Sequence, residues 1–161
     1  MNRHQLLLTV FILLCFHSFA QKRTPVIQLK SGDIQASENV SQPFLDSFNN
    51  HAPRYEDKAY ALLQFHTIPT PEVKEALAQK GISLIRYVPH QAYTASVTLP
   101  ADLPVLQRAG VRAVIHLQPQ QKMHASLPKG AFPDWAVKVP GTIDVLVQWT
   151  PVFSFDEIQT A

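Results

Sequence analysis

The clearest pattern in the chain is an alternation of apolar and polar residues in four short stretches, with helical spacing between some of them. The alternation predicts strands at residues 60–66, 82–88, 93–99 and 111–117. Apolar residues three and four apart predict helices at residues 70–80 and 101–109, each followed by a glycine. This order of elements is that of a split β-α-β unit, so we expect an α+β fold with a ferredoxin-like βαββαβ domain.

The first predicted helix has start and stop signals that agree with one another. Thr70 is a suitable N-cap, and Pro71 suits the first helical position because its missing N–H is not needed there. Gly81 suits the left-handed position that follows a helix. Agreement between independent signals favours this helix more strongly than any single one of them.

The alternation also assigns residues to the two faces of the predicted sheet. Ala61 and Leu63 face the helices, whereas Leu62, Val114 and Tyr87 are assigned to the opposite, open face. A half-apolar face that no helix covers often docks onto another surface, so these three residues are our candidate docking contacts. The alternative is an ordinary mixed surface with no partner.

The first twenty residues have the pattern of an export signal. Arg3 precedes an apolar run at residues 6–16, which is too short to span a bilayer core of ~30 Å. Small residues before the end of the segment predict cleavage between Ala20 and Gln21. We therefore expect a mature chain that is secreted, at the cell surface or in the periplasm, with no membrane span after cleavage. A retained membrane anchor is the alternative.

The rest of the chain divides into four parts after the signal peptide at residues 1–20. We expect an extended approach segment at 21–57, the ferredoxin-like domain at 58–123, a linker at 124–140 and the start of a second unit at 141–161. Within the approach segment, the pattern predicts a short strand at 25–30 and a short helix within 37–50, and Asn39-Val-Ser41 fits the N-glycosylation pattern.

The C-terminal part begins a second strand and helix. Residues 141–149 predict a strand, and Ser154 can cap a helix that follows. The same order begins at residue 60, so we interpret residues 141–161 as a truncated second α/β unit and the chain as a fragment of a longer protein. The alternative is that residues 141–149 add a strand or hairpin to the first sheet.

Composition and spacing favour no catalytic or cofactor chemistry. A formal charge of +2 without runs of like charge does not indicate a nucleic-acid partner. The histidines lack metal-ligand spacing, and the single cysteine, Cys15, lies in the signal segment. His116 or His124 could join Ser126 and Asp134 in a triad on paper, but no G-x-S-x-G turn presents the serine. We expect no metal, no cofactor and no catalytic residue.

Four motifs together resemble a known family. They are Leu29-Lys-Ser-Gly32, Tyr60-Ala-Leu-Leu-Gln-Phe-His66, Lys80-Gly-Ile-Ser-Leu-Ile-Arg-Tyr-Val-Pro-His-Gln-Ala-Tyr93 and Gly110-Val-Arg112. The chain resembles the N-terminal prodomain, of the fervidolysin-like type, of secreted bacterial subtilisin-like serine peptidases. The resemblance covers roughly residues 27–117 and, more loosely, residues 139–158, and its motifs are structural rather than catalytic.

The resemblance implies a non-catalytic role beside a protease. Such prodomains help the downstream protease domain of the same chain to fold and inhibit it, docking through the open face of the sheet. A following segment can occupy the active-site cleft as a substrate does. The catalytic residues of a serine endopeptidase would lie beyond Ala161. A free-standing secreted protein-binding or adhesion module is the alternative function.

Overall fold

The fold is α+β. The computed structural model describes residues 25–36, 38–127, 129–130, 132–149, 156 and 159. Its elements are β1 (Val26–Leu29), β2 (Gly32–Gln35), α2 (Gln42–His51), β3 (Arg54–Tyr55), β4 (Lys58–Phe65), α3 (Pro71–Ala78), β5 (Ile82–Val88), β6 (Ala92–Thr98), α4 (Leu103–Arg108), β7 (Val111–Ile115), α5 (Pro119–Lys122) and a 3-10 turn at Asp134–Ala136. The six elements expected between residues 60 and 117 are all confirmed, with ends shifted by a few residues.

The main sheet has five strands and is antiparallel at every pairing among the described residues. Its order is β7-β4-β6-β5, and the short β3 pairs with the start of β4 on the same edge as β7. Strands β1 and β2 form a separate antiparallel hairpin. The sequence pattern predicted β1 but not β2, because Gly32–Gln35 contains only one apolar residue.

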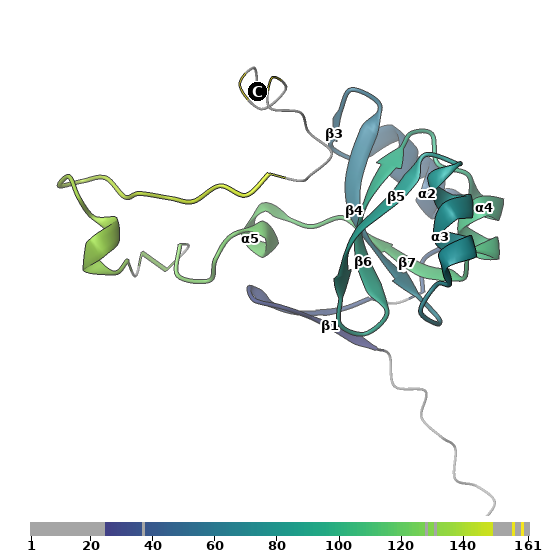
Figure 1. The fold of residues 1–161 in the computed structure, drawn as a ribbon, viewed down its shortest axis with the longest axis horizontal. Helices are drawn as coiled ribbons and strands as arrows, with labels where there is room; N and C mark the ends of the chain where they lie inside the picture. The colour runs from purple at the N-terminus through teal and green to yellow at the C-terminus, as the bar shows by residue number, and fades with distance from the viewer. Residues whose placement is uncertain are drawn as a thin grey trace, which may run out of the picture.

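One face of the sheet is covered by α2, α3 and α4, which Figure 1 shows together on one side of the molecule. Their buried side chains form one apolar cluster with the strands, which we call the helix-side cluster. It includes Leu45, Phe48, Leu63, Phe65, Leu77, Tyr93, Leu106 and Val114. Two of these come from α2, so the approach segment contributes to the core of the sheet domain rather than standing apart from it.

The start and end of α3 follow from the residues expected there. Thr70 caps the helix, since its side chain accepts a hydrogen bond from the backbone N–H of Val73 at 3.5 Å. Gly81 has a positive φ of 75°, and a Cβ at this position would lie 2.8 Å from Cβ of Thr98. Only glycine fits both conditions, so α3 ends where β6 passes close behind it.

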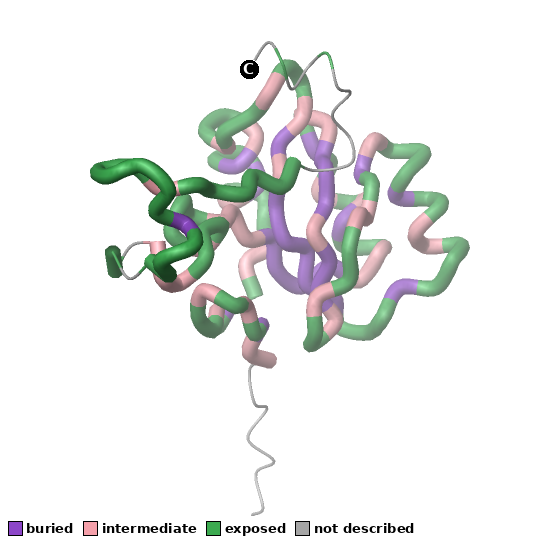
Figure 2. Tube along the Cα trace, turned by 60° about the vertical axis from the view of Figure 1, so that its left-hand side comes forward, coloured by how far each residue is buried: buried purple, intermediate pink, exposed green. Residues whose placement is uncertain are grey.

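The other face of the sheet is covered by the β1–β2 hairpin. Ile27, Leu62 and Ala92 are all fully buried and form a second cluster, which we call the hairpin-side cluster. Ile34 of β2 and Ile115 of β7 pack against it. Figure 2 shows the resulting concentration of buried residues along the central strands. The face that the sequence pattern left open is therefore packed against residues of the same chain.

Two β-bulges change which residues share a face. Register shifts occur between Gln64 and Phe65 in the β4–β7 pair, and between Leu84 and Arg86 in the β5–β6 pair. Each bulge adds one residue to a strand and so reverses the faces of the residues beyond it. The strict alternation assumed from the sequence is therefore wrong in β5 and β7.

The bulges move two of the three residues assigned to the open face, Val114 and Tyr87, to the helix side of the sheet. Val114 lies opposite Leu63 in the helix-side cluster, and Ile115 instead lies opposite Leu62 on the hairpin side. Tyr87 lies opposite Tyr93, which also belongs to the helix-side cluster. The assignment of Val114 and Tyr87 to the same face as Leu62 is corrected accordingly.

The predicted strand at residues 141–149 does not form. Residues 142–149 have no regular secondary structure, and they form the returning arm of a long excursion that leaves the sheet after α5 (Figure 1). A strand is stable only when its backbone groups pair with a neighbour, and residues 142–148 have no strand partner within the described part of the chain. The helix expected from Ser154 lies almost wholly outside the described residues.

Candidate interaction surfaces

The three predicted docking residues do not form one surface. Leu62 is 0% exposed beneath the hairpin, and Val114 is 2% exposed beneath the helices. Tyr87 alone is accessible, at 47% exposure. The predicted cleavage site, Ala20 and Gln21, lies outside the described residues.

Tyr87 is held in a small aromatic group at the edge strand β5. Its ring meets that of Tyr93 edge-on with centroids 5.3 Å apart, and Tyr93 meets Phe65 in the same way at 5.9 Å. The ammonium of Lys74 lies 5.0 Å from the centre of the Tyr93 ring. Such contacts fix the rings in place, so Tyr87 offers a rigid apolar platform beside an edge strand.

A buried polar network joins the approach segment to the sheet. Gln64 is fully buried, donates a hydrogen bond to the carbonyl of His90 at 3.0 Å and accepts one from Arg112. Arg112 is 7% exposed, donates to the carbonyl of Ala36 at 3.2 Å, and has its Nε 3.8 Å from a carboxylate oxygen of Glu38. Because the buried side chains of Gln64 and Arg112 are already hydrogen-bonded within the chain, we interpret this network as part of the fold and not as a ligand site.

Asn39 covers the edge of β7 with its side chain. Its amide nitrogen donates to the carbonyl of Val114 at 2.8 Å, and its amide oxygen accepts from the Val114 N–H at 2.9 Å. The side chain thus completes the backbone hydrogen bonds of an edge residue. The amide nitrogen that a glycan would modify is already bonded, so the Asn39-Val-Ser41 pattern does not mark an accessible glycosylation site in the folded chain.

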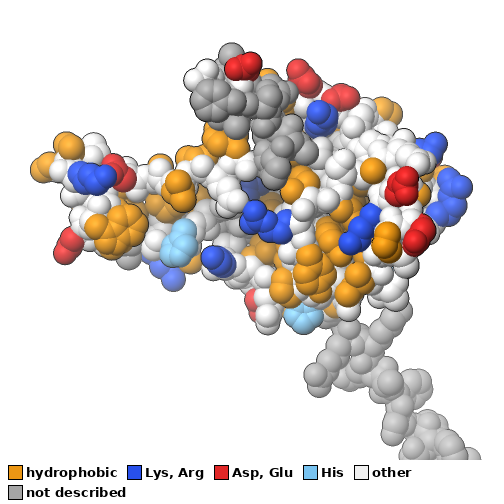
Figure 3. Space-filling model, viewed as in Figure 1, with side chains coloured by type: hydrophobic (Ala, Val, Ile, Leu, Met, Phe, Trp, Pro, Cys, Tyr) orange, Lys and Arg blue, Asp and Glu red, His pale blue; other side chains and the backbone are white. Residues whose placement is uncertain are grey.

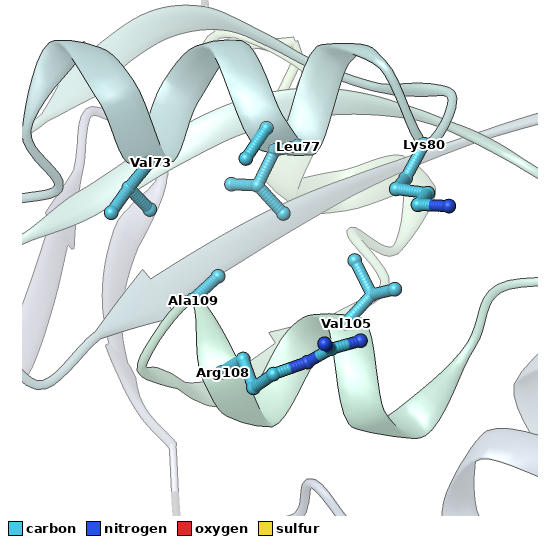
Figure 4. Close-up of a pocket in the computed structure, with 7 residues that line it drawn as sticks. Val73, Leu77, Lys80, Val105, Arg108 and Ala109 are labelled. Atoms are coloured by element: carbon cyan, nitrogen blue, oxygen red, sulfur yellow. The ribbon is translucent and has the colours of Figure 1, made fainter.

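A groove lies between α3 and α4, on the side of the helices that faces solvent (Figure 4). Its volume is about 230 Å³, and its lining residues are Val73, Ala76, Leu77, Lys80, Val105, Arg108 and Ala109. Of the three apolar α3 residues that line it, only Leu77 is buried. The sequence carried no signal for this groove, because it predicted a helix at 101–109, whereas α4 has six residues and leaves part of α3 uncovered.

An exposed apolar segment follows the sheet domain. The exposed fraction is 99% for Leu146 and 57% and 62% for its neighbours Val145 and Val147. Val139 and Trp149 are also exposed. Figure 3 shows hydrophobic side chains along this projecting part of the molecule. Contiguous exposed apolar side chains on a soluble chain mark a binding surface more often than scattered ones do.

Of the residues considered as a catalytic triad in the sequence, only His124 and Ser126 lie together. His124 Nδ1 lies 2.8 Å from Oγ of Ser126 and accepts a hydrogen bond from the Ser126 backbone N–H at 3.3 Å. No hydrogen bond or ion pair links Asp134 to His124 within the described residues, and His116 lies in the chain just after β7. The pair is a local turn in which no third group orients the imidazole, whereas a triad requires one.

The described residues give two further negative findings. They contain no group of three or more His, Cys, Asp or Glu side chains placed to hold a metal ion. Within the same part of the chain, no helix combines the length and the apolar character needed to cross a bilayer.

Comparisons with known proteins give one match. A family model described as a domain of unknown function (DUF8729) matches residues 28–118, which run from within β1 to just past β7. No curated protein and no solved structure gives a significant match. The matched range covers more than half of the 161 residues and includes most of the hairpin, α2 and the whole five-stranded sheet. The chain belongs to the DUF8729 family.

Proposed function

We propose that the chain is the non-catalytic N-terminal region of an exported subtilisin-like serine peptidase, and that it acts as a folding chaperone and inhibitor of the protease domain. The motifs that resemble subtilisin-like prodomains lie at residues 29–32, 60–66, 80–93 and 110–112. The function requires no catalytic residue in this chain. It requires a stable folded unit and a surface that binds the native protease, because binding to the native state alone favours folding.

We also infer that the sheet domain is ferredoxin-like. Three features support this arrangement: the strand order β7-β4-β6-β5, the antiparallel pairings, and α3 and α4 as the two connections on one face. The hairpin β1–β2, α2 and β3 are then additions at the N-terminal side of that unit.

The observation that carries the proposed function is the exposed segment at residues 139–149. It follows the sheet domain after α5 and the 3-10 turn at Asp134–Ala136, has an irregular backbone, and presents Val145, Leu146 and Val147 to solvent. An extended peptide can add to the edge of a sheet in a receptor, where backbone hydrogen bonds supply affinity and alternate side chains enter pockets. A substrate-like position in a protease cleft needs such a segment.

Packing of the hairpin changes which residues take part in docking. Leu62 is covered by Ile27, and Val114 by the helices, so neither can contact a protease unless part of the core opens. The exposed segment and the Tyr87 edge are accessible without any rearrangement. We therefore assign inhibition to residues 139–149, with Tyr87 as a secondary contact.

Inhibition of a subtilisin tests this function. The purified chain, recovered as the exported product, is added to a subtilisin that hydrolyses a chromogenic peptide, and the initial rate is measured against chain concentration. We expect slowed hydrolysis that Leu146→Asp weakens about tenfold or more, because a charge replaces an apolar contact. Ile68→Asp is the matched control, since Ile68 is exposed at 57% in a loop before α3.

Two results would contradict the assignment. Unchanged hydrolysis at micromolar chain concentration would argue against inhibition. Equal weakening by Ile68→Asp and Leu146→Asp would argue against the segment as the contact.

A secreted protein-binding or adhesion module is the second candidate function. The groove between α3 and α4 favours it, because this surface faces away from the hairpin and is independent of the exposed segment. Binding of a partner by the groove without any effect on a protease would select this candidate.

A further inference from the structure

The groove between α3 and α4 is apolar along its length. Val73 and Ala76 of α3 form one wall, Val105 of α4 and the following Ala109 form the other, and the buried Leu77 lies between them. Figure 4 shows the side chains of Val73 and Leu77 directed toward α4, and that of Val105 directed toward α3. The space between the helices is therefore bounded by carbon atoms from both sides.

The groove exists because small residues stand where the helices face each other. The side chains of Ala76 and Ala109 are single methyl groups, which are too small to fill the space between the two helices. The second helix has six residues and begins with a proline in its first turn, so it covers little of α3. The apolar surface that lines this groove is unfavourably exposed to water, and a partner's apolar side chains would cover it.

Two cations stand at the edge of this apolar space. Lys80 follows the end of α3, and Arg108 is in the last turn of α4, so the two lie on opposite sides of the groove (Figure 4). Nε of Arg108 donates to the carbonyl of Pro104 at 3.1 Å, which holds the guanidinium along its own helix. Within the described part of the chain, neither cation has a carboxylate at ion-pair distance.

The size of the groove decides between a small molecule and a peptide. Pockets for drug-sized ligands measure about 300–1,000 Å³ and enclose most of the ligand. This groove measures about 230 Å³ and is open to solvent. It accommodates one or two aliphatic side chains, as in grooves that receive the apolar face of an amphipathic helix.

We propose that the groove docks a segment of a partner protein that carries aliphatic side chains next to carboxylates. The aliphatic side chains lie between Val73 and Val105, and the carboxylates lie against Lys80 and Arg108. Charge complementarity selects an acidic segment over a basic one. This docking role does not depend on protease inhibition, because it uses neither residues 139–149 nor the edge strand β5.

A titration with designed peptides tests the docking role. The probe is a 14-residue amphipathic helical peptide with leucines on one face and glutamates beside them; the control peptide has lysine in place of every glutamate. The ¹⁵N-labelled chain is titrated with each peptide, and amide shifts are followed together with the dissociation constant. We expect the acidic peptide to shift Ala76, Lys80 and Ala109, and to bind about tenfold or more tightly than the basic peptide.

Three variants separate the groove from general charge effects. Lys80→Glu combined with Arg108→Glu reverses the charge at both positions, and we expect binding of the acidic peptide to weaken about tenfold or more. Ala109→Leu fills the groove without a change of charge, and we expect weakening of similar size. Lys129→Glu changes net charge at an exposed position outside the helices, and we expect less than about twofold change.

Clear results would overturn the docking role. Equal binding of the acidic and basic peptides would remove the role of Lys80 and Arg108. Full binding by Ala109→Leu, or shifts confined to other elements, would place the peptide elsewhere. Shifts at the groove that depend on chain concentration without peptide would assign the groove to a second copy of the chain, and so would also overturn an acidic partner segment.

Discussion

Two stretches of this chain have nearly the same apolar alternation and reach different structures. Residues 58–65 form β4, with neighbours β6 and β7 on its two sides and covered faces above and below. Residues 142–149 have no regular structure, and Leu146 is 99% exposed. Alternation therefore indicates that a segment can become a strand, and the available pairing partners decide whether it does.

The same difference separates stability from binding. Residues of β4 are already committed to contacts within the chain, so substitutions there act on folding. The 139–149 segment has exposed apolar side chains, so we expect substitutions there to leave folding nearly unchanged and to act on the proposed binding. Matched substitutions in the two regions test whether folding and binding are separated in this way.

The largest expected effect comes from placing a charge in each region. Leu62→Asp puts a carboxylate where the side chain is fully buried, and we expect a loss of about 4 kcal/mol or more in the free energy of unfolding. Leu146→Asp should change that free energy by less than about 0.5 kcal/mol. Urea denaturation of both variants measures the difference. Similar losses in the two variants would break the distinction.

A smaller effect is expected for the contact between the hairpin and the sheet. Ile27→Ala removes a fully buried side chain from the hairpin-side cluster, and we expect a loss of about 2–4 kcal/mol. Val145→Ala is the control in the exposed segment and should change the free energy of unfolding by less than about 0.5 kcal/mol. A loss below about 1 kcal/mol for Ile27→Ala would mean that the hairpin is not part of the core.

Two glycines with similar backbone angles provide the next comparison. Gly81 has φ of 75° and Thr98 within 2.8 Å of the position of a Cβ, whereas Gly141 has φ of 83° and nothing within 4 Å. Gly81→Ala combines strain with a clash, and we expect a loss of about 2–3 kcal/mol. Gly141→Ala has strain alone, with about 1 kcal/mol or less expected. Thermal denaturation ranks the two, and an equal loss would remove the role of Thr98.

The smallest effect concerns pH. The hydrogen bond from the Thr70 side chain lowers the pKa of Glu72 from its usual 4.5. A carboxyl with a lowered pKa in the folded chain contributes stability above its unfolded pKa, and this contribution is lost as pH falls through the folded pKa. We expect Glu72→Gln to reduce slightly the acid dependence of unfolding below about pH 4.5. Unfolding curves measured at pH 3 and pH 6 compare the two chains, and an unchanged acid dependence would contradict it.

Local signals were sufficient for most of the sheet domain. The cap at Thr70, the glycine at 81 and the alternation of β4 each act through neighbours in the chain, so their structures follow from the sequence. The β2 strand could not be predicted in this way, since it depends on pairing with β1 and packing on Leu62.

The sheet face of each predicted docking residue could not be read from the sequence, because a β-bulge earlier in a strand changes the face of every residue that follows. One extra residue in β7, Arg112, and one in β5, Ile85, reverse the faces of Val114 and Tyr87. The groove was also not visible in the sequence, because it depends on the distance between two helices and not on either helix alone.

Hydrogen–deuterium exchange of the chain with and without a catalytically inactive subtilisin tests the division between a packed sheet and a binding segment most directly. Amides of β4 should be protected in the free chain and unchanged by the protease, because their hydrogen bonds are internal. Amides of residues 145–148 should exchange rapidly in the free chain and become protected in the complex, whereas those of Thr142 and Asp144 already donate to Val139 and Ala136. Protection gained only at the sheet, with residues 145–148 still exchanging rapidly, would contradict the assignment of binding to that segment.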